Sequence, residues 1–89
     1  MKAVISVIGK DKVGILAAVS EKCAKHSINI IDVSQTVLSE MFCMIMICDI
    51  SKINMDFGDF AKEMKAYGIE NGMSIHAMHE DIFNSMHQI

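Results

Sequence analysis

The sequence predicts an α+β protein of the ferredoxin-like class, a βαββαβ sandwich followed by a short C-terminal helix. Two observations predict this fold. The chain reads as two similar halves, each with a helix-like segment between two strand-like segments, and the halves are joined strand to strand at a hairpin. Right-handed crossovers in both halves would place the two long helices on the same face of one antiparallel sheet, with the strands in the order 4-1-3-2.

The first half opens with an apolar strand, then a polar loop with two glycines, then a helix. Residues 4–8 predict the strand and residues 9–14 the loop. Glycine lets the backbone approach a ligand and the first N–H groups of a helix are unpaired, so this layout often binds small anions or amino-acid head groups. A β–α turn whose glycines only permit tight packing has the same pattern. The spacing of the glycines matches neither the G-x-G-x-x-G fingerprint nor a P-loop, so nucleotide binding is not indicated. The predicted helix carries apolar residues at helical spacing: Ile15, Leu16, Val19 and Cys23.

The two middle strands form the hairpin that joins the halves. Residues 28–38 are β-branched and extended, with polar residues set among the apolar ones. Ser39 and Glu40 are suited to the hairpin tip, and residues 41–50 return as a strongly apolar strand.

The second half repeats the helix and strand. Asn54 or Asp56 offers a side-chain oxygen to cap the second long helix, and Gly68 or Gly72 ends it. Residues 73–79 predict the fourth strand, and residues 80–88 a short final helix. Apolar side chains spaced three and four apart define the long helix: Phe57, Phe60, Ala61, Met64 and Tyr67.

Length and composition indicate one domain, residues 1–89, with more apolar surface than it can bury. The chain has 89 residues, of which 52% are hydrophobic. The first and third strands are apolar on both faces, whereas two helices cover only one face of a sheet. A second copy of the chain is the economical cover, so we expect a homodimer.

Charge and sequence patterning exclude several partners. The formal net charge is −3, and all eight basic residues are lysine. Without arginine or a basic stripe, direct binding to nucleic acid is not expected. The longest apolar run, residues 41–48, is too short to span a bilayer, and no signal peptide precedes the first strand, so no membrane association is expected.

Cysteine usage points to a reducing compartment. Cys23, Cys43 and Cys48 form no C-x-x-C motif and are odd in number. Each lies in an apolar helix or strand, so we expect buried, reduced thiols and a cytoplasmic protein. Nothing basic lies beside them in the sequence to activate a thiolate.

Three stretches of the chain carry a family resemblance: residues 4–15 (VISVIGKDKVGI), residues 27–30 (SINI) with Asp32 and Gln35, and residues 44–46 (MIM). Together with the ending, they resemble the ACT domain, a small-molecule-sensing module attached to many enzymes of amino-acid metabolism. The ending, residues 79–87, is similar to a subfamily of stand-alone ACT proteins related to regulators of the glycine cleavage system. The resemblance covers essentially the whole chain. It implies a dimer-forming regulatory fold that binds amino-acid effectors between the first loop and helix of one protomer and the second strand of a neighbour.

The resemblance assigns candidate ligand-binding residues to two segments. The helix N-terminus would hold a carboxylate, and Asp11 would take an α-ammonium group, although Asp is also a good helix cap. On the second strand, Asn29 and Gln35 share parity and Asp32 faces the other way, unless a bulge intervenes. The loop supplies Asp11, Val13, Gly14, Ile15 and Leu16, and the strand supplies Asn29, Ile30, Asp32 and Gln35.

No arrangement of residues predicts a metal, a cofactor or catalysis. His76 and His79 are three apart in a strand, which sends them to opposite faces. No Ser-His-acid or paired-carboxylate arrangement follows from the linear spacing, so we do not expect an enzyme. Two classes remain. One is a regulatory module that senses an amino acid or similar metabolite and signals to a protein partner. The other is a protein-interaction module with no ligand of its own.

Overall fold

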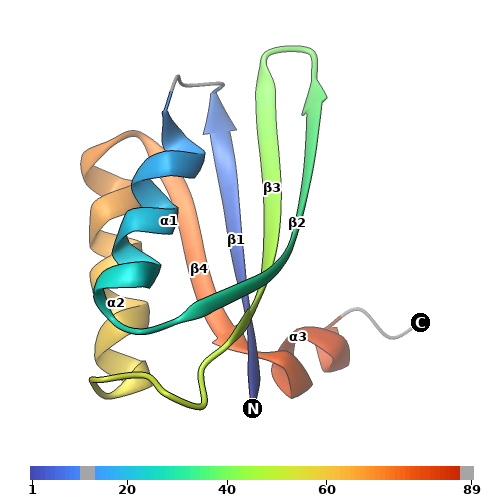
Figure 1. The fold of residues 1–89 in the computed structure, drawn as a ribbon. Coiled ribbons are helices and arrows are strands. Elements are labelled where there is room, and N and C mark those ends of the chain that lie inside the picture. Colours follow the sequence, from blue (N-terminus) through green and yellow to red (C-terminus); the bar gives the residue numbers. More distant parts are fainter. Residues whose placement is uncertain (11–13, 87–89) are drawn as a thin grey trace.

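The computed structural model describes residues 1–10 and 14–86. Its sheet has four strands in the order β2-β3-β1-β4, with all neighbours antiparallel, which is the predicted order read from the opposite edge (Figure 1). The ferredoxin-like fold with an added C-terminal helix is therefore confirmed. The elements are β1 (Lys2–Lys10), α1 (Ile15–Lys25), β2 (Asn29–Leu38), β3 (Met41–Asp49), α2 (Phe57–Glu70), β4 (Met73–His79) and α3 (Glu80–Met86).

β1 and β2 do not begin at the residues that the sequence predicts. β1 is longer than residues 4–8 because Lys2 and Lys10 still pair with Asp49 and Met41 of β3, beyond the apolar run. β2 begins one residue later than predicted because the N–H of Ile28 donates to the carbonyl of Cys23 (2.9 Å), which closes the turn after α1.

Of the residues predicted to begin and end α2, Asp56 and Gly72 are found at its ends. Asp56, not Asn54, caps α2, accepting a hydrogen bond from the Asp59 N–H (3.2 Å). Gly72, with φ 70°, follows the end of α2, whereas Gly68 lies buried inside the helix. Residues 87–88, which were expected to continue α3, lie outside the described residues.

The core lies between the sheet and the two long helices. α1 and α2 cover one face of the sheet (Figure 1). They bury Val19 and Cys23 from α1 and Phe60 and Met64 from α2, all without exposed surface. The strands contribute the alternate residues that face these helices: Ala3, Ile5, Val7, Phe42, Met44, Met46, Cys48, Met73 and Ile75.

The other face of the sheet is only partly covered. α3 contacts β1 and β4 and lies on the side away from α1 and α2, near the start of β1 (Figure 1). On this open face Val4 is 3% exposed, whereas Ile8, farther from α3, is 42% exposed. Cys43 is half-buried here, not buried as predicted, because none of the described helices covers its part of β3. Across the described ranges, 1–10 and 14–86, no helix is long and apolar enough to cross a membrane.

Candidate functional site

The predicted effector loop leads into α1, and the described part of it begins at Gly14. Gly14 is the N-cap of α1 and has φ 83°, a left-handed conformation that side chains rarely adopt. A Cβ atom on Gly14 would have no neighbour within 4 Å. Glycine is therefore required here by the backbone conformation and not by close packing. Ile15 is buried in the core, whereas Leu16 is 36% exposed beside the loop. Asp11 and Val13 lie outside the described residues.

A β-bulge rearranges the predicted residues of β2. Ile30 pairs with Cys48 and Asp32 with Ile47, so Ile31 is the extra residue. Directly opposed residues share a face, and the bulge places Asn29 and Asp32 together on the open face.

Gln35 lies on the other face from this pair. It is opposite Met44 on the helix-covered side, so the parity predicted for an uninterrupted strand, which grouped Gln35 with Asn29, is wrong. Ile30, on the same side as Gln35, is half-buried and packs against the core.

Gly14 and the start of β2 lie at opposite ends of the protomer. Asn29 and Lys2 both pair with Asp49, at the end of the sheet where β1 begins. β1 ends and α1 begins at the opposite end of the sheet (Figure 1). α1 has 11 residues and runs between the two ends, a rise of about 16 Å. One protomer therefore does not bring Gly14 together with Asn29 and Asp32.

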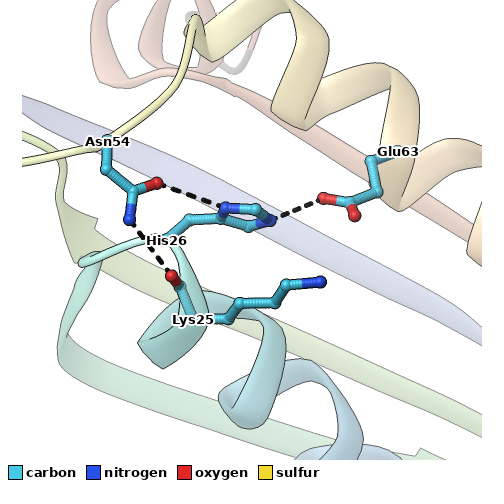
Figure 2. Close-up of polar contacts among 4 residues, drawn as sticks. All are labelled: Lys25, His26, Asn54 and Glu63. Carbon is cyan, nitrogen blue, oxygen red and sulfur yellow. Dashed lines mark hydrogen bonds and ion pairs between the residues drawn. The ribbon is translucent and has the colours of Figure 1, made fainter.

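A polar cluster that the sequence analysis did not single out surrounds His26, the C-cap of α1 (Figure 2). Its Nε2 lies 2.9 Å from Glu63 Oε2, and its Nδ1 lies 3.3 Å from Asn54 Oδ1. Asn54 Nδ2 donates to the Lys25 carbonyl (3.1 Å), so the amide oxygen is the atom that faces the ring. Phe60 packs edge-on against the imidazole, 5.7 Å between ring centroids.

The His26 cluster ties three segments together. Because both ring nitrogens face acceptors, both bonds are made only by the imidazolium cation. The backbone N–H of Asn54 also donates to the His26 carbonyl (3.1 Å), so the loop before α2 is held twice. Positions 26, 54 and 63 share no local spacing, which is why the sequence pattern did not reveal them. The cluster has the character of a structural clamp.

His76 and His79, which the sequence analysis weighed as metal ligands, lie on opposite faces of β4, as expected. His76 pairs with Ser6 on the open face, and His79 pairs with Ala3 on the covered face. The His79 ring packs on Phe57 at 4.6 Å. It borders an open hollow of about 860 Å³ between the start of β1 and α3. Among the described residues, no group of His, Cys, Asp and Glu side chains has the arrangement of a metal site.

Comparison with known proteins agrees with this geometry. The family model for the ACT domain matches residues 2–78. The chain belongs to the ACT domain family. A UPF0237 protein from Listeria innocua is 49% identical to this ACT protein over 89 residues, and the match covers 100% of both chains. The solved structure of an ACT domain protein from Streptococcus pneumoniae has a TM-score of 0.80 and 43% identity, and the match covers 93% of each chain.

A more distant structure shares the fold alone. It is a glycine cleavage system transcriptional repressor-like protein, with a TM-score of 0.70 and 19% identity over 85% of this ACT chain and 43% of the other chain. ACT domains are regulatory modules that bind small molecules. The resemblance to stand-alone ACT proteins is confirmed by the family model and by the full-length match to the Listeria protein.

Proposed function

We propose that this ACT protein is a homodimer that binds an amino acid or similar small metabolite at the interface between its two protomers. The bound state is then signalled to a protein partner, and the chain itself is not an enzyme. One observation carries this proposal: the loop at Gly14 and the polar pair Asn29 and Asp32 lie at opposite ends of α1. A site that uses both segments needs the loop of one protomer and β2 of the other.

Exposed apolar side chains beside both segments support pairing. Leu16 is 36% exposed next to the loop, and Ile31 is 49% exposed at the bulge between Asn29 and Asp32. Large apolar side chains that cluster with polar groups on a surface mark interaction sites. If a second copy of the chain covers Leu16 and Ile31, the surface at each of these residues is used twice in the dimer, as two-fold symmetry requires.

Each half of the proposed site suits one end of an amino acid. The unpaired N–H groups that open α1 attract a carboxylate, and Gly14 has no side chain to block it. Asp11 would hold the α-ammonium group. On the partner's β2, Asn29 and Asp32 share the open face, so they would contact the same ligand. Ile15, Leu16, Val13, Ile30 and Gln35 complete the proposed ligand-binding set.

The decisive experiment measures ligand binding and self-association together. Thermal-shift screening against the amino acids should find one that raises the melting temperature, because a ligand at 100 times its Kd adds about 2.7 kcal/mol. Sedimentation equilibrium with that ligand should then show tighter dimerisation, since binding at an interface is linked to assembly. A stable monomer that binds the ligand as tightly as the dimer would contradict the shared site.

A protein-interaction module with no ligand is the second candidate, and α3 favours it. This helix buries none of its residues, while Ile82 and Met86 are 52% and 66% exposed. If no amino acid shifts the melting temperature while a co-purified protein is released by Ile82→Gln, this second function holds. Ile69→Gln, a comparably exposed site on α2, is the matched control.

We also propose that residues 1–89 form a single domain in the cytoplasm. The continuous core from Ala3 to Ile75 supports one domain, and the three free cysteines support a reducing compartment. The net charge of −3 without arginine supports regulation through a protein partner and not through direct contact with nucleic acid.

A further inference from the structure

β4 is an edge strand that lacks the usual protection of an exposed sheet edge. Among the described strands it pairs only with β1, so every second residue turns its N–H and C=O groups away from the sheet. The chain has no proline, and residues 73–79 contain no lysine, aspartate or glutamate. β2, the other edge, is interrupted by the bulge at Ile31 and carries Asp32. β4 is therefore the edge that is open to a further strand.

A groove follows this edge, between the C-terminal half of α2 and the first half of β4. It has a volume of about 320 Å³ and is lined by Lys65 and Ile69 of α2 and by residues 72–76. No described residue of β1 lines it, so the groove lies along the outer side of β4 and not beneath the helix. A groove that borders an edge strand accommodates an extended peptide as an added strand.

The helical side of the groove is apolar at one end and basic along the rest. Ile69 is largely exposed. Lys65 lies one turn before it and Lys62 one turn earlier still, on the same face of α2 by helical spacing. Among the described residues, none forms an ion pair or hydrogen bond with the Lys65 ammonium, and none that lines the groove is acidic. An occupant with a carboxylate and an apolar side chain complements this wall.

The spacing along α2 also matches the spacing of side chains in a strand. The helix rises about 6 Å from Lys65 to Ile69, because each residue adds about 1.5 Å. Side chains on one face of a strand repeat about every 6.8 Å. An acidic and an apolar residue two positions apart in a peptide would therefore reach Lys65 and Ile69 together.

The directions of the elements set the order of these two residues. α2 and β4 run in opposite directions, because Phe57 at the start of α2 packs on His79, whereas Gly68 near its end approaches Met73. The neighbouring strands of this sheet are all antiparallel, and antiparallel pairing is the more stable kind. A strand added antiparallel to β4 runs parallel to α2, so it meets the lysines before Ile69.

We propose that the groove along β4 binds an extended peptide of a protein partner, which joins the sheet as a fifth strand antiparallel to β4. From its N-terminus the peptide carries an acidic residue, any residue and an apolar residue. The carboxylate pairs with Lys65 and the apolar side chain packs on Ile69, while hydrogen bonds to the backbone of β4 supply affinity. A second copy of the chain does not fit, because its own β4 edge brings the same lysines against these.

The test titrates the isotope-labelled protein, without any amino acid, with the blocked peptide acetyl-ETETITT-amide. By NMR spectroscopy, we expect shifted amide resonances between residues 62 and 76. Hydrogen exchange should slow at the β4 amides that exchange fast in the free protein, since these point outward. The reversed peptide, acetyl-TTITETE-amide, has the same composition and should bind more weakly.

Charge reversal tests the contact with Lys65. Lys65→Glu should weaken binding about tenfold, because repulsion replaces an exposed ion pair. The peptide acetyl-ETKTITT-amide should bind this variant more tightly than it binds the wild type. Lys25→Glu, at an exposed position on α1 outside the groove, is the matched control and should change nothing.

Binding at this groove is independent of the proposed amino-acid site and of α3. Ile69→Gln should weaken the peptide, whereas Ile82→Gln should not, so these two substitutions separate the groove from α3. No binding at millimolar peptide, slowed exchange at β2 in place of β4, or equal binding of the reversed peptide would overturn the proposal. So would β4 amides that are already protected in the free protein, because a second copy would then occupy the edge.

Discussion

At the scale of single residues, the His26 cluster is the most informative contact outside the core. Its ring bonds Asn54 and Glu63, which precede and belong to α2, while His26 itself ends α1 (Figure 2). The side chain of His26 is 13% exposed and that of Glu63 is 36% exposed, so the pair is partly shielded from water. A shielded, charge-assisted hydrogen bond is worth more than an exposed ion pair.

His26→Ala should therefore lower the free energy of unfolding by about 1–3 kcal/mol, because it leaves partners unpaired and uncovers Phe60. His76→Ala is the matched control, since His76 is exposed and bonds only Ser74 (2.9 Å) among the hydrogen bonds described; its effect should stay within about 0.5 kcal/mol. Urea denaturation measures both. If both substitutions changed the free energy of unfolding equally, the His26 cluster would add nothing to stability.

Asp49 gives a prediction about pH. Hydrogen bonds from the backbone N–H (2.9 Å) and side chain of Ser51 hold the pKa of this carboxyl below its ordinary value of 3.8, with a smaller contribution from the Met1 ammonium at 3.9 Å. Because the folded pKa is the lower one, the stabilisation is complete above the unfolded pKa and disappears as the pH falls through the folded one. The Asp49→Asn protein should thus have a lower melting temperature than the wild type at neutral pH. The two melting temperatures should converge in acid, below the pKa of Asp49 in the folded protein. A difference in melting temperature that persists unchanged in strong acid would contradict this assignment.

At the scale of elements, α2 approaches β4 closely at Gly68. A Cβ on Gly68 would lie 2.7 Å from the Met73 carbonyl oxygen and 3.0 Å from the Ile75 side chain. Backbone atoms cannot move aside as a flexible side chain can. Gly68→Ala should therefore destabilise the protein by about 1–3 kcal/mol despite the better helix propensity of alanine. Ala66→Ser, on the exposed side of α2, is the control, and thermal unfolding compares them. An unchanged melting temperature in Gly68→Ala would mean that the helix can shift away from the strand.

The elements also show where sequence reasoning succeeds and where it stops. β4 and the strand order follow from local spacing and the handedness of crossovers, and both are confirmed. The bulge at Ile31 does not follow, because Ile30 and Ile31 are equally apolar and β-branched and nothing local says which is the extra residue. The pair His26–Glu63 joins positions far apart in the chain, so only the folded arrangement reveals it.

At the scale of the whole molecule, the proposed site requires two chains, and this can be tested by mixing two defective variants. Leu16→Asp places a carboxylate beside the proposed carboxylate site, and Asp32→Ala removes a polar group of β2. Each homodimer should lose binding of the amino acid found by thermal-shift screening. A mixed dimer combines the intact loop of one variant with the intact β2 of the other, so it regains one site of two.

Random pairing of equal amounts should restore about a quarter of the wild-type binding sites, because half of the dimers are mixed and each has one intact site. Isothermal titration of the mixture, after unfolding and refolding together, measures this stoichiometry. The control is a mixture of Leu16→Asp with Leu16→Asp/Asp32→Ala, in which every loop is defective and no site can be restored. Binding by neither mixture would place the whole site within one protomer, because such a site stays defective however the chains pair. Recovery in the first mixture alone requires that the ligand contacts both chains, which makes effector binding and dimerisation thermodynamically coupled.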